Sequence, residues 1–253
     1  MLRALWTGAT GMASQQLLID TISNNLANVN TTGYKKQRVQ FQDLYYETVN
    51  VGVGSTATLG SGSRVSATDR SFRQGNVERT DDPLSMAIEG QGFFAVETGS
   101  GIAYTRDGSF RLDANGRLCT AAGYTVVGDG GVIEIPEGAT EIEVTDDGII
   151  SGVLNGTRQT FATISLVLFV NPAGLEATGG NLYRATQLSG EPVEAVPGQD
   201  GAGLLRGGYI ETSNVEIVTE MVNLIIAQRA FELNSKAVET ADQMWGIANN
   251  VKR

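Results

Sequence analysis

Three groups of residues in this sequence could do chemistry: adjacent carboxylates, glycine-rich loops and a single cysteine. The adjacent carboxylates are Asp81 with Asp82 and Asp146 with Asp147. Because the chain has no histidine, a Ser-His-Asp or Cys-His site is impossible, and paired acids are the remaining enzymatic alternative. Adjacent residues point to opposite faces of a strand, and in turns they bond to nearby backbone. We therefore predict that both pairs are turn residues.

The glycine-rich loops do not match a nucleotide or calcium site. The stretch GVGSTATLGSGS at 52–63 lacks the Gly-Lys-Ser/Thr ending of a phosphate loop and is predicted to be a flexible or extended linker. DANG at 113–116 lacks the spaced acids of a calcium loop and predicts a hairpin turn. The segment GRLCTAAGY around Cys119 is predicted to be a strand, and we expect Cys119 to be a small buried thiol there. We expect no catalytic, cofactor-binding or metal site.

Composition excludes further classes of function. A net charge of −10 in 253 residues argues against a nucleic-acid partner, which requires clustered basic residues. One cysteine excludes an intrachain disulfide framework. The N-terminal segment is interrupted by polar residues, unlike a secretory signal, and no apolar run is long enough to span a bilayer. We expect a soluble chain, either cytoplasmic or exported without a cleaved signal.

Helical periodicity is found at both ends of the chain. Apolar residues repeat every seven positions in residues 1–29 and again from about 214 onward, which predicts two amphipathic helices with narrow stripes. The repeating residues are Leu5, Met12, Ile19 and Leu26, with Ile22 beside them, and Leu224, Phe231, Val238 and Trp245. Ser213 and Glu216 fit a capping box at the start of the second helix.

The middle, from about 39 to 210, is predicted to be β-rich. Short β-branched and alternating runs such as FFAVE, YTVVG, EIEVT and ISLVLFV predict strands, and turn signals at 113–116, 128–131, 146–148 and 154–156 separate them. The expected fold class is α+β, mostly β: an antiparallel middle domain between two long helices. The helices could pack on each other, on the β domain, or on helices of neighbouring molecules.

Three motifs carry a resemblance to a known family. SNNLANVNTTGYKK at 23–36 and the segment 211–244, with Ser213-Asn214-Val215 and Gln228-Arg229-Ala230, resemble the terminal signatures of bacterial flagellar rod and hook axial proteins. PLSMAIEGQGFFAV at 83–96 and the segment 104–124 resemble the central signature. MLRALWTGATGM, FQDLYYET at 41–48 and GAGLLRGGYIETSN at 201–214 are most similar to distal rod subunits.

The resemblance implies an architecture, partners and a location. The termini, 1–30 plus 214–253, would pair as a coiled-coil-like axial core domain; 31–75 plus 190–213 would form an extended connector, and 76–189 an outer β-rich domain. The implied protein is a non-enzymatic rod subunit that polymerises with itself into a torque-transmitting tube. Its partners would be other rod proteins, the hook protein, ring proteins around the rod and the flagellar type III export apparatus. Its location would be the basal body, crossing the periplasm or cell wall.

Particular residues follow from this interpretation. Leu5, Met12, Ile19, Ile22, Leu26, Leu224, Phe231, Val238 and Trp245 are predicted subunit-packing positions, together with Asn24, Asn25, Asn28, Gln228 and Arg229. Asn24 and Asn25 would fix register with neighbouring helices, or lie on a solvated surface. Asn28 would help to end the helix before a turn containing Gly33, Tyr34 and Lys35.

Alternative functions stay open at this point. The stretch between Glu47 and Arg64 is shorter than in many distal rod proteins, so a neighbouring proximal rod subunit is one alternative. A secreted β-rich adhesin with a closed bundle of terminal helices is another. A carbohydrate-active enzyme using Asp81, Asp82, Asp146 and Asp147 is the third.

Overall fold

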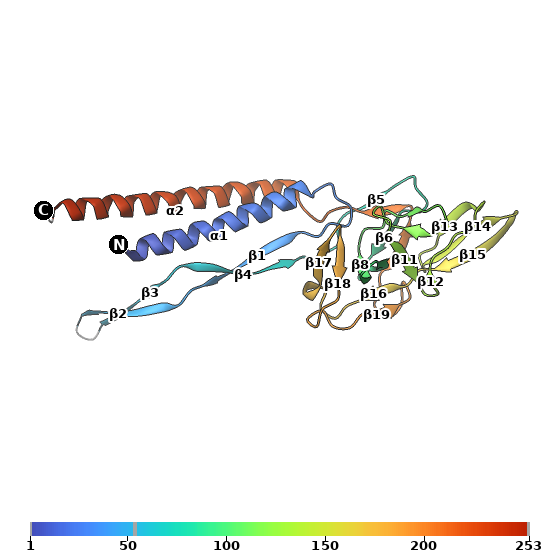
Figure 1. Ribbon diagram of the computed structural model, residues 1–253, viewed down its shortest axis with the longest axis horizontal. Helices are drawn as coiled ribbons and strands as arrows, with labels where there is room; N and C mark the ends of the chain where they lie inside the picture. The colour runs from blue at the N-terminus through green and yellow to red at the C-terminus, as the bar shows by residue number, and fades with distance from the viewer. Residues whose placement is uncertain (1, 53–54, 252–253) are drawn as a thin grey trace. The chain divides into compact units, whose positions relative to one another are not determined.

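The structure is a computed structural model that describes residues 2–52 and 55–251 (Figure 1). The chain forms two compact units. Unit 1 contains Met1–Ala27, Gln37–Ser71 and Val215–Arg253, and unit 2 contains Asn28–Lys36 and Phe72–Asn214. Each unit is therefore assembled from segments far apart in the sequence.

Unit 1 is built on two long helices, α1 (Leu2–Ala27) and α2 (Ile217–Val251), which lie side by side (Figure 1). Neither helix contains proline, and apolar residues recur at helical spacing, so each helix has one face to bury. The pair is antiparallel, since Asn25 contacts Glu220 whereas Gly8 lies against Val238. The predicted pairing of the terminal helices is confirmed.

The second helix begins at Ile217, three residues after the predicted start. Residues 212–214 lie outside the helix, and they are bonded within unit 2. The Thr212 N–H donates to the Asn76 carbonyl, and the Asn214 side chain accepts from the Lys36 N–H at 2.8 Å. Neither helix has a stretch long and apolar enough to cross a membrane, within the residues described.

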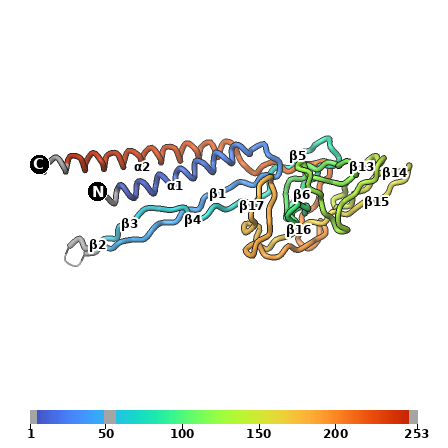
Figure 2. The backbone as a smooth tube through the Cα atoms, viewed as in Figure 1, coloured from blue at the N-terminus to red at the C-terminus, as the bar shows by residue number. Residues whose placement is uncertain are grey.

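Unit 1 also contains two antiparallel strand pairs (Figure 2). The first pair is β1 (Gln37–Asp43) with β4 (Ser63–Arg70), and the second is β2 (Tyr46–Gly52) with β3 (Ser55–Gly60). The predicted linker at 52–63 is thus wrong for residues 55–60. Alternating threonines at 56 and 58 suit a strand, and the run pairs with β2.

The largest sheet of unit 2 has eight antiparallel strands. Its order is β17, β18, β8, β7, β11, β10 and β9, with β12 also paired to β11. The strands are β7 (Phe94–Thr98), β8 (Gly101–Thr105), β9 (Arg111–Leu112), β10 (Leu118–Cys119), β11 (Thr125–Gly128), β12 (Gly131–Val132), β17 (Glu176–Gly179) and β18 (Leu182–Arg184).

Smaller antiparallel groups complete unit 2. One is a three-stranded meander and three are pairs: β5 with β21, β6 with β20, and β16 with β19. Their bounds are β5 (Val77–Arg79), β6 (Met86–Glu89), β13 (Thr140–Val144), β14 (Ile149–Leu154), β15 (Thr157–Thr163), β16 (Leu166–Leu168), β19 (Val193–Ala195), β20 (Leu204–Gly207) and β21 (Tyr209–Glu211), with a short 3-10 helix at Pro172–Gly174.

The core of unit 2 follows the two-residue period of its strands. Phe94 and Val96 of β7 are buried in one cluster with Leu118 and Val126, whereas Phe93 is buried in a second cluster with Tyr183. Successive side chains of a strand point to opposite faces, so the FFAVE run supplies both clusters. The predicted strand is confirmed, and the structure adds that both of its faces are buried.

The predicted turns are confirmed where the sequence supplied turn residues. Asp113 accepts bonds from the N–H groups of Asn115 and Arg117, and Gly116 has a φ of 76° between β9 and β10. Asn155, with a φ of 52°, and Gly156 join β14 to β15. Positive φ at both central residues is the geometry that tight hairpins require.

The predicted fold class, α+β with long terminal helices around a β-rich middle, is confirmed. The three-part division with a separate connector remains a prediction. In the structure, residues 37–71 group with the helices and 190–213 with the β strands.

Candidate functional site

The contact between α1 and α2 depends on small residues. A side-chain carbon added at Gly8 would lie 2.5 Å from Val238 Cγ2, and one added at Gly11 would lie 2.9 Å from Asn234 Nδ2. On α2, Ala227 and Ala241 are buried. Because these residues have little or no side chain, the two helix backbones can approach closely. Sequence reasoning missed the glycines, although their spacing of three places both on one helical face.

The heptad residues lie along this contact. Ile22 is buried, and the other predicted seam residues on both helices are half-buried, except Trp245. The half-buried residues are Leu5, Met12, Ile19, Leu26, Leu224, Phe231 and Val238. Val238 lies against Gly8 of the other helix, and the role of the whole set in packing between subunits stays a prediction.

Trp245 is 45% exposed because it has no counterpart on α1. Asn25 lies opposite Glu220, and Gly11 lies opposite Asn234. Continued along the antiparallel pair, this alignment places the first residue of α1 opposite a residue of α2 that precedes Trp245. Trp245 therefore lies where α2 extends past α1. Gln228 and Arg229 are also exposed, and Arg229 pairs with Glu232 of the same helix at 2.8 Å.

The outer face of α2 is apolar as well. Six exposed apolar side chains lie on its first half, on the side away from the buried row that contains Glu220 and Ala227. These residues, which we call the outer face, are Val218, Met221, Val222, Ile225, Ile226 and Leu233. A group of exposed apolar side chains on one side of a helix, here beside the exposed pair of Arg229 and Glu232, has the character of an interface.

Asn25 joins three elements of unit 1. Its side-chain amide donates to the Gln37 carbonyl at 2.9 Å and to a Glu220 carboxylate oxygen at 3.2 Å, and its oxygen accepts from the Gln37 N–H at 2.9 Å. Asn25 and Glu220 are each 1% exposed. Asn24, by contrast, is exposed. Within one chain Asn25 thus binds α2 and the start of β1, and the predicted register function with neighbouring helices stays a prediction.

The turn that follows α1 is held firmly inside unit 2. The Asn28 carbonyl and side-chain oxygen both accept bonds from Thr31, as a helix-ending residue would. Gly33 has a φ of 66°, and an added side-chain carbon would lie 2.6 Å from the Asp107 nitrogen. Its N–H donates to the Glu211 carbonyl at 2.8 Å. Only glycine combines this backbone angle with such a close approach.

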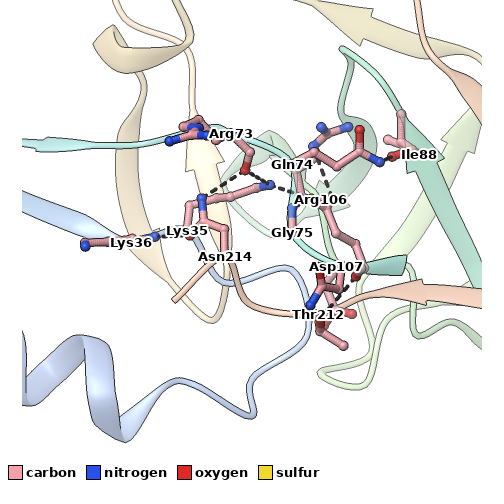
Figure 3. A network of polar contacts seen from close by, with 12 residues as sticks. Lys35, Lys36, Arg73, Gln74, Gly75, Ile88, Arg106, Asp107, Thr212 and Asn214 are labelled. Atoms are coloured by element: carbon pink, nitrogen blue, oxygen red, sulfur yellow. Dashed lines mark hydrogen bonds and ion pairs between the residues drawn. The ribbon is translucent and has the colours of Figure 1, made fainter. Parts of the chain in front are cut away.

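Lys35 leads into a buried charge cluster in unit 2. Lys35 Nζ lies 2.6 Å from Glu211 Oε1 and donates to the Arg73 carbonyl, toward which Asn214 also points (Figure 3). Arg106 Nε is 3.5 Å from Glu211 Oε2. Lys35 and Glu211 have fully buried side chains and Arg106 is nearly so. Two cations therefore share one carboxylate away from water.

Burial sets the protonation behaviour of this cluster. Loss of hydration lowers the pKa of Lys35, the nearby Glu211 carboxylate opposes that shift, and Arg106 adds to it. Burial likewise lowers the pKa of Arg106. The Gly75 N–H also donates to Glu211, at 2.8 Å. The cluster ties residues 33–35 to β21, so the turn after the first helix is an integral part of unit 2.

Ser213 and Glu216, the residues of the predicted capping box, lie in different surroundings in the structure. Ser213 is buried in unit 2, and Glu216 directly precedes α2. The Glu216 carbonyl accepts the first helical bond, from Glu220, and its carboxylate accepts from the Thr219 hydroxyl at 2.8 Å. Glu216 therefore lies at the start of the helix, Ser213 lies four residues before Ile217, and the capping role of the two residues stays a prediction.

The paired acids lie in turns, as predicted. Asp82 accepts bonds from the N–H groups of Leu84 and Ser85. Asp146 pairs with Arg206 at 3.0 Å, beside the turn that ends at Gly148. Cys119 is buried in β10. Among the described residues, no group of three or more His, Cys, Asp or Glu side chains could hold a metal ion.

Three family profiles match successive parts of the chain. Residues 5–35 match "Flagella basal body rod protein", residues 87–152 match the "Flagellar hook protein FlgE/F/G D1 domain", and residues 206–251 match "Flagellar basal body rod FlgEFG protein C-terminal". The first and third profiles cover the helix seam and the terminal motifs. The second covers strands β7 to β12 of the large sheet of unit 2, and it ends before β17 and β18.

Full-length relatives give the same result. The chain is 46% identical to "Flagellar basal-body rod protein FlgG" of Borreliella burgdorferi, over 100% of both chains. It is 46% identical to the protein of that name from Buchnera aphidicola subsp. Acyrthosiphon pisum, over 96% of this chain and 97% of the relative. The Bacillus subtilis protein of that name is 40% identical over 100% of both chains.

Proposed function

The chain belongs to the flagellar basal-body rod protein family, and we propose that it assembles as a distal rod subunit into the helical tube that transmits motor torque to the hook. It is a structural component of the basal body, from a family of structural proteins. The full-length similarity to FlgG proteins favours the distal position over the neighbouring rod positions.

The outer face of α2 is the observation that carries this proposal. Its six apolar side chains are exposed in unit 1, although α2 already buries another face against α1. Burying apolar surface contributes about 25 cal/mol per Å². A second copy of the chain presents the same apolar helices, so its helices can bury the outer face of α2. Repetition of that contact from copy to copy generates a polymer.

The charge distribution supports the proposal that the terminal helices form the core of the tube and that the β strands of unit 2 form its exterior. Most of the net negative charge belongs to unit 2, whereas unit 1 is close to neutral. Apolar helices suit the packed core, and a charged β unit suits a solvated exterior. We accordingly keep the division into an axial core of 1–30 plus 214–253, a connector of 31–75 plus 190–213, and an outer domain of 76–189 as a proposal for the assembled rod.

Family membership also suggests partners and a route. We propose contacts with other rod proteins, with the hook protein and with ring proteins around the rod. Delivery would use the flagellar type III export apparatus, and the assembled subunit would cross the periplasm or cell wall.

Electron microscopy of the purified chain tests this function. We expect tubular or ring-shaped polymers, which disappear when residues 1–30 or 214–253 are removed. Ile225→Glu, which charges the outer face, should abolish polymers while leaving the near-UV circular dichroism of unit 2 unchanged. Glu239→Gln, at an exposed position of the same helix, is the matched control. Normal polymers of the Ile225→Glu chain would contradict the proposed role of the outer face.

A further inference from the structure

The seam between α1 and α2 carries an alternating pattern on α2. Four residues repeat every seven positions on its inner row, two polar and two alanines: Glu220, Ala227, Asn234 and Ala241. Asn25 bonds to Glu220 at one end of α1, and Gly11 faces Asn234 further along. Each polar position of α2 therefore has its own counterpart on α1.

The apolar part of the seam would accept another alignment. Leu224, Phe231 and Val238 also repeat every seven positions, and α2 has 35 residues whereas α1 has 26. A slide of one heptad, about 10 Å, toward the free end of α2 would keep α1 paired along its length. Such a slide would even bring Trp245 alongside α1. The heptad spacing alone does not select between the two alignments, although the slide would place Trp245 rather than Val238 against Gly8, where the two helices approach closely.

The polar contacts do select between them. After the slide, the Asn25 amide would lie beside the Ala227 methyl group, and the buried Glu220 carboxylate would lose the Asn25 donor. A buried polar group that loses a hydrogen bond is destabilised relative to the native alignment. Asn25 would also lose alignment with Gln37, whose N–H and carbonyl it binds at the start of β1.

We propose that Asn25 is the register-determining residue of the chain, and that its bond to Glu220 selects one axial alignment of α1 on α2. This inference rests on the proposed function, because a misaligned pair would present α1 about 10 Å out of place to neighbouring subunits. A polar residue in an apolar seam fixes register in coiled coils by the same physical mechanism.

Two cysteine pairs report the alignment in the full-length chain carrying Cys119→Ser. A side-chain carbon at Gly8 lies 3.9 Å from Val238 Cβ, within the range that a disulfide bridges. One chain that carries Gly8→Cys, Val238→Cys and Trp245→Cys therefore reports both alignments: an 8–238 disulfide marks the native alignment, and an 8–245 disulfide marks the slipped one. We expect the 8–238 cross-link to dominate in the parent chain. Asn25→Ala should raise the ratio of 8–245 to 8–238 cross-link about tenfold.

Matched variants separate register from general stability. Asn24→Ala changes the adjacent, exposed asparagine and should leave the ratio unchanged. Glu220→Gln keeps an oxygen that can accept from Asn25 and should also leave it unchanged, whereas Glu220→Ala should act like Asn25→Ala. An unchanged ratio in both Asn25→Ala and Glu220→Ala would overturn the inference, as would a parent chain without the 8–238 cross-link.

Microscopy of the same samples keeps the two proposals distinguishable. A parent chain that forms the 8–238 cross-link but no polymer contradicts the proposed function and supports the native helix alignment. A parent chain that polymerises, with an Asn25→Ala variant that keeps the native cross-link, contradicts the register inference alone.

Discussion

The stability of unit 2 should fall by different amounts when Lys35 or Glu211 of its buried charge cluster is neutralised. The changes are Lys35→Met and Glu211→Gln, which keep side-chain length close to the original. Lys35→Met leaves the Glu211 carboxylate with Arg106 at 3.5 Å and with the Gly75 N–H at 2.8 Å. Glu211→Gln instead leaves two buried cations, Lys35 and Arg106, with neutral oxygens only among the groups described around them.

The expected magnitudes follow from counting the charges that stay uncompensated. Removing one partner of a buried ion pair costs about 3–5 kcal/mol. Because Arg106 continues to neutralise Glu211, we expect Lys35→Met to cost about 3 kcal/mol of unfolding free energy, at the low end of that range. Glu211→Gln should cost about 5 kcal/mol. The double variant should cost less than the sum, since the two residues are in direct contact.

Urea unfolding with two optical signals measures these differences. Trp6 and Trp245 are the two tryptophans and both belong to unit 1, so their fluorescence follows that unit. Most tyrosines belong to unit 2, so near-UV circular dichroism of tyrosine follows the unit that contains the cluster. As a control, Arg117→Met removes a cation from the exposed pair with Glu134 and should cost less than about 1 kcal/mol.

The reasoning would be refuted by the reverse order of effects. If Lys35→Met destabilised unit 2 as much as Glu211→Gln, Arg106 would not be compensating the carboxylate. If neither variant cost more than the Arg117→Met control, the cluster would not behave as a buried one.

Three further outcomes are expected. Gly33→Ala should lower the stability of unit 2 by about 1–3 kcal/mol in the same urea assay, because the added carbon meets Asp107 in a left-handed backbone; an unchanged midpoint would contradict the close approach. The Arg117 N–H bond lowers the pKa of Asp113, so its stabilisation is present above its ordinary value of 3.8 and is lost as pH falls through the lowered pKa. The stability difference between the parent chain and Asp113→Asn should shrink over that interval, and a pH-independent difference would exclude this origin. Phe231→Ala should reduce polymer formation more than it destabilises unit 2, measured by sedimentation and tyrosine circular dichroism; equal losses would argue against separate roles.

The strands and turns of unit 2 were predictable because their determinants are local. Asp113 and Gly116 specify their hairpin turn with their own backbone angles and bonds, and the FFAVE run alternates between two apolar clusters. The prediction of a linker at 52–63 was wrong for residues 55–60. The glycines of this stretch favour a linker, whereas its alternating threonines favour the strand that forms. A strand that pairs with a distant segment depends on that partner as well as on its own composition.

The bonding partners of Lys35, in the buried charge cluster, and of Asn25, on the first helix, were not predictable. The sequence predicts that Lys35 belongs to a turn. Nothing near it in the sequence indicates that its side chain shares a buried cluster with Glu211 and Arg106, which lie far away along the chain. Asn25 was identified as a candidate for register, but its bonds to Glu220 and Gln37 depend on how α1 and α2 align. The late start of α2 has the same origin, since residues 212–214 lie outside the helix and are bonded to Asn76 and Lys36.

The sequence by itself determined the two terminal helices, the β-rich middle, its turns and the family, because periodicity, turn chemistry and motifs are properties of short segments. Only the tertiary structure decided which unit each segment joins, that Asn25 binds Glu220 in the same chain, and that α2 keeps an apolar outer face after pairing with α1. These features depend on the alignment of segments nearly 200 residues apart. A periodic pattern states that a helix has a face to bury, and the three-dimensional packing decides which surface covers that face and which surface remains for a neighbouring subunit.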